Sequence, residues 1–230
     1  MNFEHVSLAE CNNLTGTVVV IDVLRAFSTA AYAFAAGVER ILPVSSIEEA
    51  FALKERYPSA LLVGEVRGLP IPGFDFNNSP TVILKQHLAG KQLIQRTTAG
   101  TQGVVRSQTA DLLLAGSFCC AAATARYIRK HAGQDALVTF VVTGEFEDGS
   151  GDEDAACADY IQSLLKGGTP DPGPYLQRVW ASLAAEKFLD ERVPEFLKSD
   201  VDYCTVLDRF DFAMRVEKQD GLLVMKPVVP

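Results

Sequence analysis

The sequence is poor in the patterns that mark oxidised or histidine-based sites. Its five cysteines (Cys11, Cys119, Cys120, Cys157 and Cys204) are odd in number and include no Cys-x-x-Cys pair, and nothing in the chain resembles a secretory leader. We therefore expect reduced thiols and a cytoplasmic location. The three histidines, His5, His87 and His131, lie outside every polar segment described below. They give no indication of a phosphohistidine or a histidine-rich metal site, and we expect them at the surface.

Positive charge and long apolar runs are also scarce. The chain has 21 Lys and Arg residues against 29 Asp and Glu, a formal net charge of −8. This balance argues against nucleic acid or an anionic membrane as the main partner, so any bound anion must be held by local geometry. No apolar run approaches the length of a membrane span. We expect no nucleic acid and no membrane among the partners, and leave a homodimer open.

Short apolar runs rich in β-branched residues are plentiful, and several are followed by a small-residue turn and then a helical pattern. With 230 residues and 48% hydrophobic composition the chain can bury a sizeable core. The pattern predicts an α/β protein, a layered α/β/α fold with a mainly parallel or mixed sheet. The predicted strands are 17–22, 40–44, 60–64, 91–95, 111–116 and 137–142, and the predicted helices are 25–36, 47–57, 102–107, 119–131 and 152–166.

The last part of the chain has a different pattern. After the turn-rich "GGTPDPGP" comes a predicted helix over 175–189, and "FAMRVEKQDGLLVMKPV" predicts a hairpin with its turn at Gln-Asp-Gly. We expect one domain over 1–230, with 170–230 as a C-terminal extension that adds an antiparallel hairpin to the main body.

Two of the predicted strands end on a carboxylate with an arginine close behind. Asp22 and Arg25 follow the first strand, and Glu65 and Arg67 follow the third. Asp22 could be a simple helix cap, or the carboxylates could bind a metal and the arginines an anion. The stretch 64–80 is rich in Gly and Pro, and a long loop without secondary structure is more often functional than structural. Carboxyl ends of parallel strands share one rim, where such sheets bind ligands.

Two further turns carry hydroxyl groups after predicted strands. "TTAGT", 97–101, places hydroxyls and a glycine between a strand and a helix start, which suits an anion as well as an ordinary threonine cap. No Gly-Lys-Ser/Thr follows, so this is not a Walker loop. Ser117, in "LAGSF", makes a similar turn with weaker support.

An acidic cluster follows the sixth strand, in "GEFEDGSGDED". Acidic residues at the start of a helix, here Asp152, Glu153 and Asp154, complement its macrodipole. That explanation does not cover Glu145, Glu147 and Asp148 in the same loop, whose mutual repulsion a divalent cation would relieve. Oxygen-only ligands of this kind suit Mg²⁺.

One apparent phosphatase motif lacks the residues that its function requires. "CAAATAR" matches the Cys-x5-Arg spacing of cysteine-based phosphatases at Cys120. Those loops need glycines and free amides, whereas the alanines here favour a continuous helix. We expect no nucleophilic role for Cys120.

Taken together, "VVVIDVLRAFST", "GEVRGLPIPGFDFNNSP", "TTAGT", "GSF" and the "GDED" helix make the chain resemble the 2-phosphosulfolactate phosphatase family over about 17–166. The resemblance implies an α/β fold, a Mg²⁺ cofactor, and hydrolysis of 2-phospho-3-sulfolactate to 3-sulfolactate and phosphate in coenzyme M biosynthesis. By position it implies metal ligation by Asp22, Glu65 and Asp154, catalysis by Asp22, Arg25 and Arg67, and substrate binding by Asn78, Ser79, Thr97, Thr98, Gly100, Thr101 and Ser117.

Two departures from the family pattern keep other functions open. Ala99 and Cys120 stand where members of the family often carry asparagine, so two amides that could bind substrate are missing. A different phosphate ester is one alternative, a non-catalytic small-anion-binding protein another, and a metal-dependent enzyme of another reaction type a third. Whether Asp22 attacks phosphorus or only holds the metal also stays open, with water as the simpler nucleophile.

Overall fold

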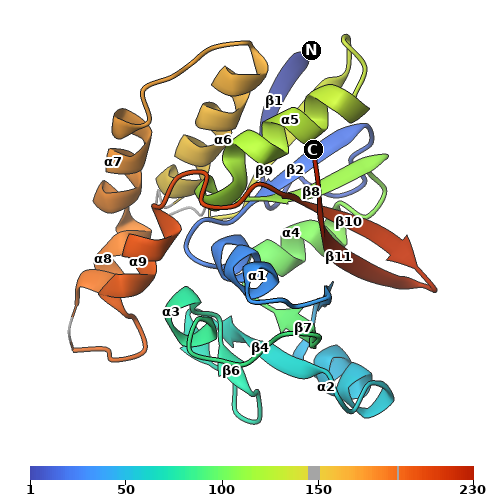
Figure 1. Cartoon of the computed structure of the whole chain (residues 1–230), viewed down its shortest axis with the longest axis vertical. Helices are drawn as coiled ribbons and strands as arrows, with labels where there is room; N and C mark the ends of the chain where they lie inside the picture. The colour runs from blue at the N-terminus through green and yellow to red at the C-terminus, as the bar shows by residue number, and fades with distance from the viewer. Residues whose placement is uncertain (145–150, 191) are drawn as a thin grey trace.

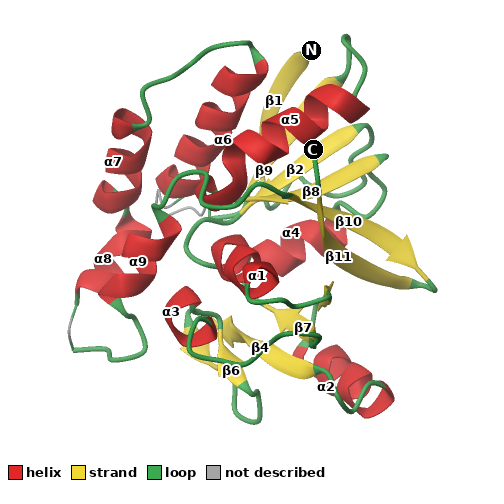
Figure 2. Cartoon of the chain, viewed as in Figure 1, coloured by secondary structure: helices red, strands yellow, loops and turns green. Residues whose placement is uncertain are grey.

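The computed structural model describes residues 1–144, 151–190 and 192–230, which fold around one long mixed sheet (Figures 1 and 2). The strands are β1 (Asn2–Ser7), β2 (Thr17–Ile21), β3 (Arg40–Pro43), β4 (Leu61–Val66), β5 (Leu69–Pro70), β6 (Phe76–Asn77), β7 (Gln92–Arg96), β8 (Leu112–Gly116), β9 (Leu137–Val142), β10 (Ala213–Gln219) and β11 (Leu222–Val228). The helices are α1 (Ala26–Ala35), α2 (Ile47–Arg56), α3 (Pro80–Ile83), α4 (Gly100–Arg106), the 3₁₀ turn η1 (Phe118–Cys120), α5 (Ala121–His131), α6 (Asp152–Leu165), α7 (Gly173–Ala181), α8 (Leu183–Leu189) and α9 (Lys198–Cys204).

The sheet consists of two parallel halves. Its order is β1-β9-β2-β8-β10-β11-β3-β7-β4-β5, with β6 beside β4. β1, β9, β2 and β8 run parallel in one half, and β3, β7 and β4 run parallel in the other. In β2 every residue is buried, as the β-branched run "TVVVI" requires of a strand covered on both faces. The six predicted strands are all confirmed.

The C-terminal hairpin joins the two halves. β10 pairs antiparallel with β8, and β11 pairs antiparallel with β3 at Met225 and Ile41. The turn between them uses Asp220 and Gly221 in left-handed backbone, with φ of 51° and 80°, as a two-residue hairpin needs. The predicted hairpin is confirmed, and it lies in the middle of the sheet rather than at an edge.

Two helices are sandwiched between the halves of the sheet. α1 and α4 lie between the strands of the first half and β7 and β4 of the second (Figure 1). Nine of the ten residues of α1 are buried, from Ala26 to Phe34, which its small alanines permit on all sides. Gly103 of α4 allows close approach to β2, because a Cβ there would lie 2.6 Å from Val20 Cγ1. One hydrophobic cluster therefore spans both halves.

Several predicted helices are confirmed within a few residues, and the tail differs most. The predicted helix 175–189 is two helices, α7 and α8, because Ser182 is extended (φ −73°, ψ 151°) and its side chain caps α8 by accepting from Ala185 N. β1 and α9 were not predicted. The stretch 64–80 was expected to be a loop, but it contains β5 and β6. No helix in the described part of the chain combines the length and apolarity of a membrane span.

Candidate active site

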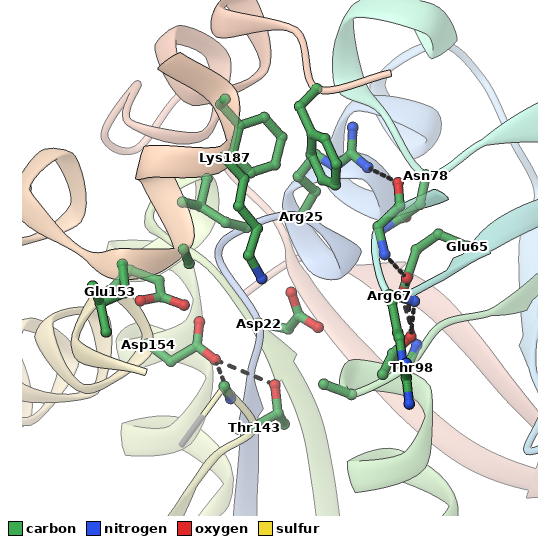
Figure 3. Close-up of a pocket in the computed structure, with 18 residues that line it drawn as sticks. Asp22, Arg25, Glu65, Arg67, Asn78, Thr98, Thr143, Glu153, Asp154 and Lys187 are labelled. Atoms are coloured by element: carbon green, nitrogen blue, oxygen red, sulfur yellow. Dashed lines mark hydrogen bonds between the residues drawn. The ribbon is translucent and has the colours of Figure 1, made fainter. Parts of the chain in front are cut away.

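A cavity of about 180 Å³ lies at the carboxyl ends of the parallel strands (Figure 3). Asp22 follows β2, Thr143 follows β9, Glu65 is the last residue but one of β4, and Thr98 lies just after β7. The first two belong to one half of the sheet and the last two to the other. The rim predicted to bind ligands is therefore a pocket that both halves build.

Four buried carboxyl groups line this cavity. Asp22 and Glu65 are each 7% exposed, Glu153 is 3% exposed and Asp154 is 2% exposed. Figure 3 shows Asp22 between the pair Glu153 and Asp154 from the start of α6 and Glu65 from β4. Buried charge of one sign is costly without a compensating partner. This concentration of carboxyl groups is the main electrostatic feature of the site.

Backbone amides hold two of these carboxyl groups in place. Asp22 Oδ1 accepts from Ala26 N at 2.8 Å, so its side chain satisfies the first amide of α1, although the N-cap residue of the helix is Arg25. Asp154 Oδ1 accepts from Val23 N at 2.7 Å, and its Oδ2 accepts from Gly144 N at 2.9 Å and Thr143 Oγ1 at 3.2 Å. Asp154 thereby ties the start of α6 to the ends of β2 and β9.

Glu65 is held by the threonine turn that follows β7. Its Oε1 accepts from Thr98 N at 2.6 Å, and its Oε2 accepts from Thr98 Oγ1 at 2.9 Å and from Gly68 N. Arg67 and Gly68 form the two-residue turn between β4 and β5, with left-handed φ of 53° and 83°. Glu65 therefore fixes the position of Thr98 and of this turn.

Burial and mutual repulsion disfavour the charged forms of Asp22, Glu153 and Asp154, whose pKa values are raised. Burial raises the pKa of Asp22 to about 7, and repulsion from Glu65 and Glu153 adds to the shift. The pKa of Asp154 is raised well above its usual value by burial, then by Glu153 and Asp22. Burial also raises the pKa of Glu153, whose Oε2 has no hydrogen-bond partner in the described chain. A bound cation would reverse these effects by stabilising the carboxylates.

The donor set matches the chemistry of Mg²⁺, although the carboxyl groups are not gathered into a closed cage. Within residues 1–144, 151–190 and 192–230, no three His, Cys, Asp or Glu side chains are close enough together to hold one metal ion. Mg²⁺ in phosphate-handling sites is commonly bound by only one or two carboxylates, with water and substrate oxygens completing its shell. The unpartnered Glu153 Oε2 and the crowded carboxyl groups fit such an open site.

Arg25 is fixed by residues from the C-terminal part of the chain. Its Nη1 donates to Asp200 Oδ2 at 2.7 Å, and its Nη2 donates to Gly68 O at 3.0 Å. The guanidinium carbon lies 4.9 Å from the ring centre of Phe188 and 5.7 Å from that of Phe196. Arg25 is 3% exposed, so this is a buried ion pair lined by aromatic rings.

Asp200 connects Arg25 to a second predicted segment. This fully buried carboxylate accepts from Ser79 Oγ at 2.7 Å and from Thr81 N at 3.0 Å, in addition to Arg25. Its bonds thus join α9, α3 and the loop before α1.

Comparison with known proteins places the chain in a family. Residues 4–219 match the family described as 2-phosphosulpholactate phosphatase. The chain belongs to this family. It is 41% identical over 204 residues to a protein of Bacillus subtilis named a probable 2-phosphosulfolactate phosphatase, covering 88% of this chain and 87% of that protein. A protein of the same name from Carboxydothermus hydrogenoformans is 38% identical over 219 residues, covering 91% and 90%.

The residues that the family resemblance pointed to fall into two groups. Seven of them line the cavity: Asp22, Arg25, Glu65, Arg67, Asn78, Thr98 and Asp154. Asn78 Oδ1 accepts from Gln95 Nε2 at 3.3 Å, which leaves its side-chain NH₂ as a donor for a ligand.

The other five lie behind the cavity wall. Thr97 and Thr101 are fully buried and cap each other: Thr97 N donates to Thr101 Oγ1, and Thr101 N donates to Thr97 Oγ1. Ser79 bonds to Asp200. Ser117 is fully buried, and its Oγ has no hydrogen-bond partner in the described chain. Gly100 has a steric role, because a Cβ there would lie 2.7 Å from Asp22 Oδ2.

The histidines and Cys120 do not contribute side chains to the described cavity wall. Glu145, Glu147 and Asp148 lie outside the described residues. The histidines His5, His87 and His131 are exposed, as predicted. Cys120 is fully buried at the start of α5, and burial raises the pKa of its thiol, which disfavours the nucleophilic thiolate. Of the two departures from the family pattern, Ala99 lines the cavity and Cys120 does not.

Sequence reasoning missed the residues that the tail contributes. Lys187, Phe188 and Phe196 line the cavity, and Asp200 holds Arg25 behind it. These residues lie in and after α8, where no motif distinguishes them from an ordinary surface helix. Only the path of the chain brings them to the site.

Proposed function

We propose that this protein is a Mg²⁺-dependent phosphatase that hydrolyses a small anionic phosphate ester, with 2-phospho-3-sulfolactate as its substrate. The observation that carries the proposal is the cavity in which four buried carboxyl groups lie beside a fixed arginine. Family membership adds the reaction class, hydrolysis of a phosphoric monoester. The products are then 3-sulfolactate and inorganic phosphate.

Two neighbouring carboxylates of the group Asp22, Glu153 and Asp154 would hold the ion, with water and substrate oxygens completing its shell. Bound there, Mg²⁺ supplies positive charge to the phosphate oxygens in a site that is otherwise strongly negative. Glu65, expected from the family resemblance to be a ligand, lies on the other side of Asp22 from Glu153 and Asp154 (Figure 3) and accepts hydrogen bonds from Thr98 and Gly68. We assign it the positioning of that part of the wall.

The chain's own residues have defined tasks in the hydrolysis. The water oxygen bonds to phosphorus, the ester P–O bond breaks, and the leaving oxygen takes the proton that the attacking water gives up. The NH₂ of Asn78 and the guanidinium of Arg67, both on the cavity wall, are donors for substrate oxygens. Phe188 and Phe196 cover one side and restrict water there. Asp22, at the centre of the carboxyl groups, acts as a ligand in this scheme and water is the nucleophile.

A panel of phosphate esters tests the proposal. Purified protein would be incubated with 2-phospho-3-sulfolactate, phosphoglycolate, phosphoenolpyruvate and p-nitrophenyl phosphate, each with Mg²⁺ and with EDTA, and released phosphate would be measured. We expect preferred, Mg²⁺-dependent hydrolysis of 2-phospho-3-sulfolactate. Preference for another ester would identify a different substrate within the same reaction class. Such a difference is consistent with Ala99, which stands where members of the family often carry asparagine. Full activity in EDTA would contradict the metal assignment, and no hydrolysis of any ester would support a non-catalytic anion-binding protein.

A further inference from the structure

Lys187 of α8 is a cation that reaches into the carboxylate cavity. Figure 3 shows its side chain descending from the helix, with the amine directed toward the space between Asp22 and Asp154. Lys187 lines the cavity, yet it is exposed and remote in sequence from every predicted motif. Its place in the pocket comes entirely from the C-terminal segment.

The amine of Lys187 attracts the Glu153 carboxylate electrostatically but has no direct partner in the described chain. Among the described residues it donates no hydrogen bond and forms no ion pair within 4.0 Å, whereas the other lysines and arginines of α7–α9 that form ion pairs do so at the surface. An ammonium beside four buried carboxyl groups without a direct partner can turn toward a ligand at little cost. Lysine suits this task because it is a compact charge on a flexible stem.

Arg25 is less available for the same task. Its two terminal nitrogens are already bonded to Asp200 and to Gly68 O, and Phe188 packs on its guanidinium. A phosphate dianion held over carboxylates requires positive charge in addition to any metal ion, because phosphoryl transfer depends on charge neutralisation at the non-bridging oxygens. Of the cationic side chains lining the described cavity, Arg67 and Lys187 are the two without hydrogen bonds or ion pairs of their own side chains.

We propose that Lys187 binds the phosphoryl oxygens of the substrate, and of the product phosphate, from the α8 side of the cavity. This rests on the proposed function only in that the ligand is a phosphate. The C-terminal segment would then supply a substrate-contacting residue as well as the partner of Arg25.

Inorganic phosphate is the direct probe, because it lacks any second anionic group. Its Kd in the presence of Mg²⁺ would be measured by calorimetry for the wild type, Lys187→Ala, Lys187→Arg and the control Lys218→Ala, whose lysine is exposed on the hairpin strand β10. We expect a Kd at least about tenfold higher in Lys187→Ala, partial rescue in Lys187→Arg, and no change in the control. The thermal midpoint should stay unchanged, since Lys187 is exposed.

Steady-state kinetics separate this inference from the function it rests on. With 2-phospho-3-sulfolactate, Lys187→Ala should lower kcat/KM by at least about tenfold. A wild type that binds phosphate through Lys187 but hydrolyses no ester would overturn the proposed function and leave this inference standing. An unchanged phosphate Kd in Lys187→Ala would overturn the inference, whether or not the KM for 2-phospho-3-sulfolactate rises. Absence of phosphate binding by the wild type would overturn it as well.

Discussion

On one side of the cavity, Asp22 and Asp154 are held by backbone amides at the strand and helix ends where they sit. On the other side, Arg25 is held by side chains from the tail, Asp200, Phe188 and Phe196. The first arrangement needs only the parallel sheet and the start of α6. The second needs the whole C-terminal segment to be folded against the sheet.

The carboxylate side carries the groups proposed to bind the metal ion, whereas the tail side positions Arg25. The carboxyl groups carry raised pKa values because they are buried near one another, a cost in stability that a bound cation would offset. The Arg25–Asp200 pair is electrically balanced within the protein. We therefore expect substitutions on the carboxylate side to change activity most, and substitutions on the tail side to change stability together with activity.

Asp22→Asn should have the largest effect on activity. The amide keeps the cap on Ala26 N but removes the central carboxylate, so kcat/KM with saturating Mg²⁺ should fall at least about ten-thousandfold, more than ~5 kcal/mol in transition-state stabilisation. Phosphate release by the purified variant measures this. Near-normal kcat/KM combined with reduced stability would mean that Asp22 is a helix cap and nothing more.

Asp200→Asn should have the next largest effect, on stability. Loss of this carboxylate leaves Arg25 buried without its counter-ion, which typically costs about 3–5 kcal/mol. Urea unfolding measures it, with Asp202→Asn as the matched control. Asp202 is on the same helix and pairs with Lys198 at the surface, so its loss should cost no more than about 1 kcal/mol. Equal losses in the two variants would show that the buried pair does not hold the tail side together.

Glu153→Gln and Glu65→Gln should differ in their metal dependence. If a carboxylate oxygen of Glu153 coordinates Mg²⁺ and Glu65 only positions the cavity wall, Glu153→Gln should raise the half-saturating Mg²⁺ concentration by about tenfold or more. Glu65→Gln should lower kcat without this shift. Activity titrated with Mg²⁺ decides between them, and the reverse pattern would restore Glu65 as the metal ligand implied by the family resemblance.

Cys120→Ala should have the smallest effect. The thiol is buried behind Ser117 and Thr124 and does not line the cavity. We expect kcat/KM to stay within about threefold of the wild type, with a modest loss of stability from the cavity created. A loss of about a thousandfold with the fold intact would revive a thiol mechanism.

The carboxylate side of the site was accessible from the sequence and the tail side was not. Asp22 follows β2, Glu65 lies near the end of β4 and Asp154 is in the first turn of α6, so the rule that parallel strands share a ligand-binding rim predicted that they lie close together. The role of Asp200 depends on contact with a residue 175 positions earlier. Its surroundings, "LKSDVDY", read as an ordinary helix.

The two main differences between the predicted and the observed fold, the position of the hairpin and the break between α7 and α8, depend on tertiary structure. The hairpin was readable from its Gln-Asp-Gly turn, but only tertiary pairing of β10 with β8 and of β11 with β3 places it between the halves of the sheet. The break between α7 and α8 depends on the extended Ser182, which no glycine or proline announces. Thr97 and Thr101 were predicted to bind substrate, and residue type alone could not show that their hydroxyls and amides hydrogen-bond to each other.

The raised pKa of Asp22 has a defined consequence for the metal-free protein. A carboxyl group with a folded-state pKa of about 7, against 3.8 when exposed, binds more protons in the folded state between these values. Its contribution to stability is therefore fully present below pH 3.8 and is lost as the pH rises through about 7, by up to about 1.4 kcal/mol per pH unit. The raised pKa values of Glu153 and Asp154 act in the same direction.

The most direct test of the account is the free energy of unfolding of wild type and Asp22→Asn, measured by urea at pH 5 and pH 8 in EDTA and again at pH 8 with Mg²⁺. In EDTA the variant should gain on the wild type as the pH rises from 5 to 8, because it lacks the buried charge. Mg²⁺ should then stabilise the wild type and leave Asp22→Asn nearly unchanged. Equal stabilisation of both proteins by Mg²⁺, or none of the wild type, would contradict the claim that these carboxyl groups form a magnesium site.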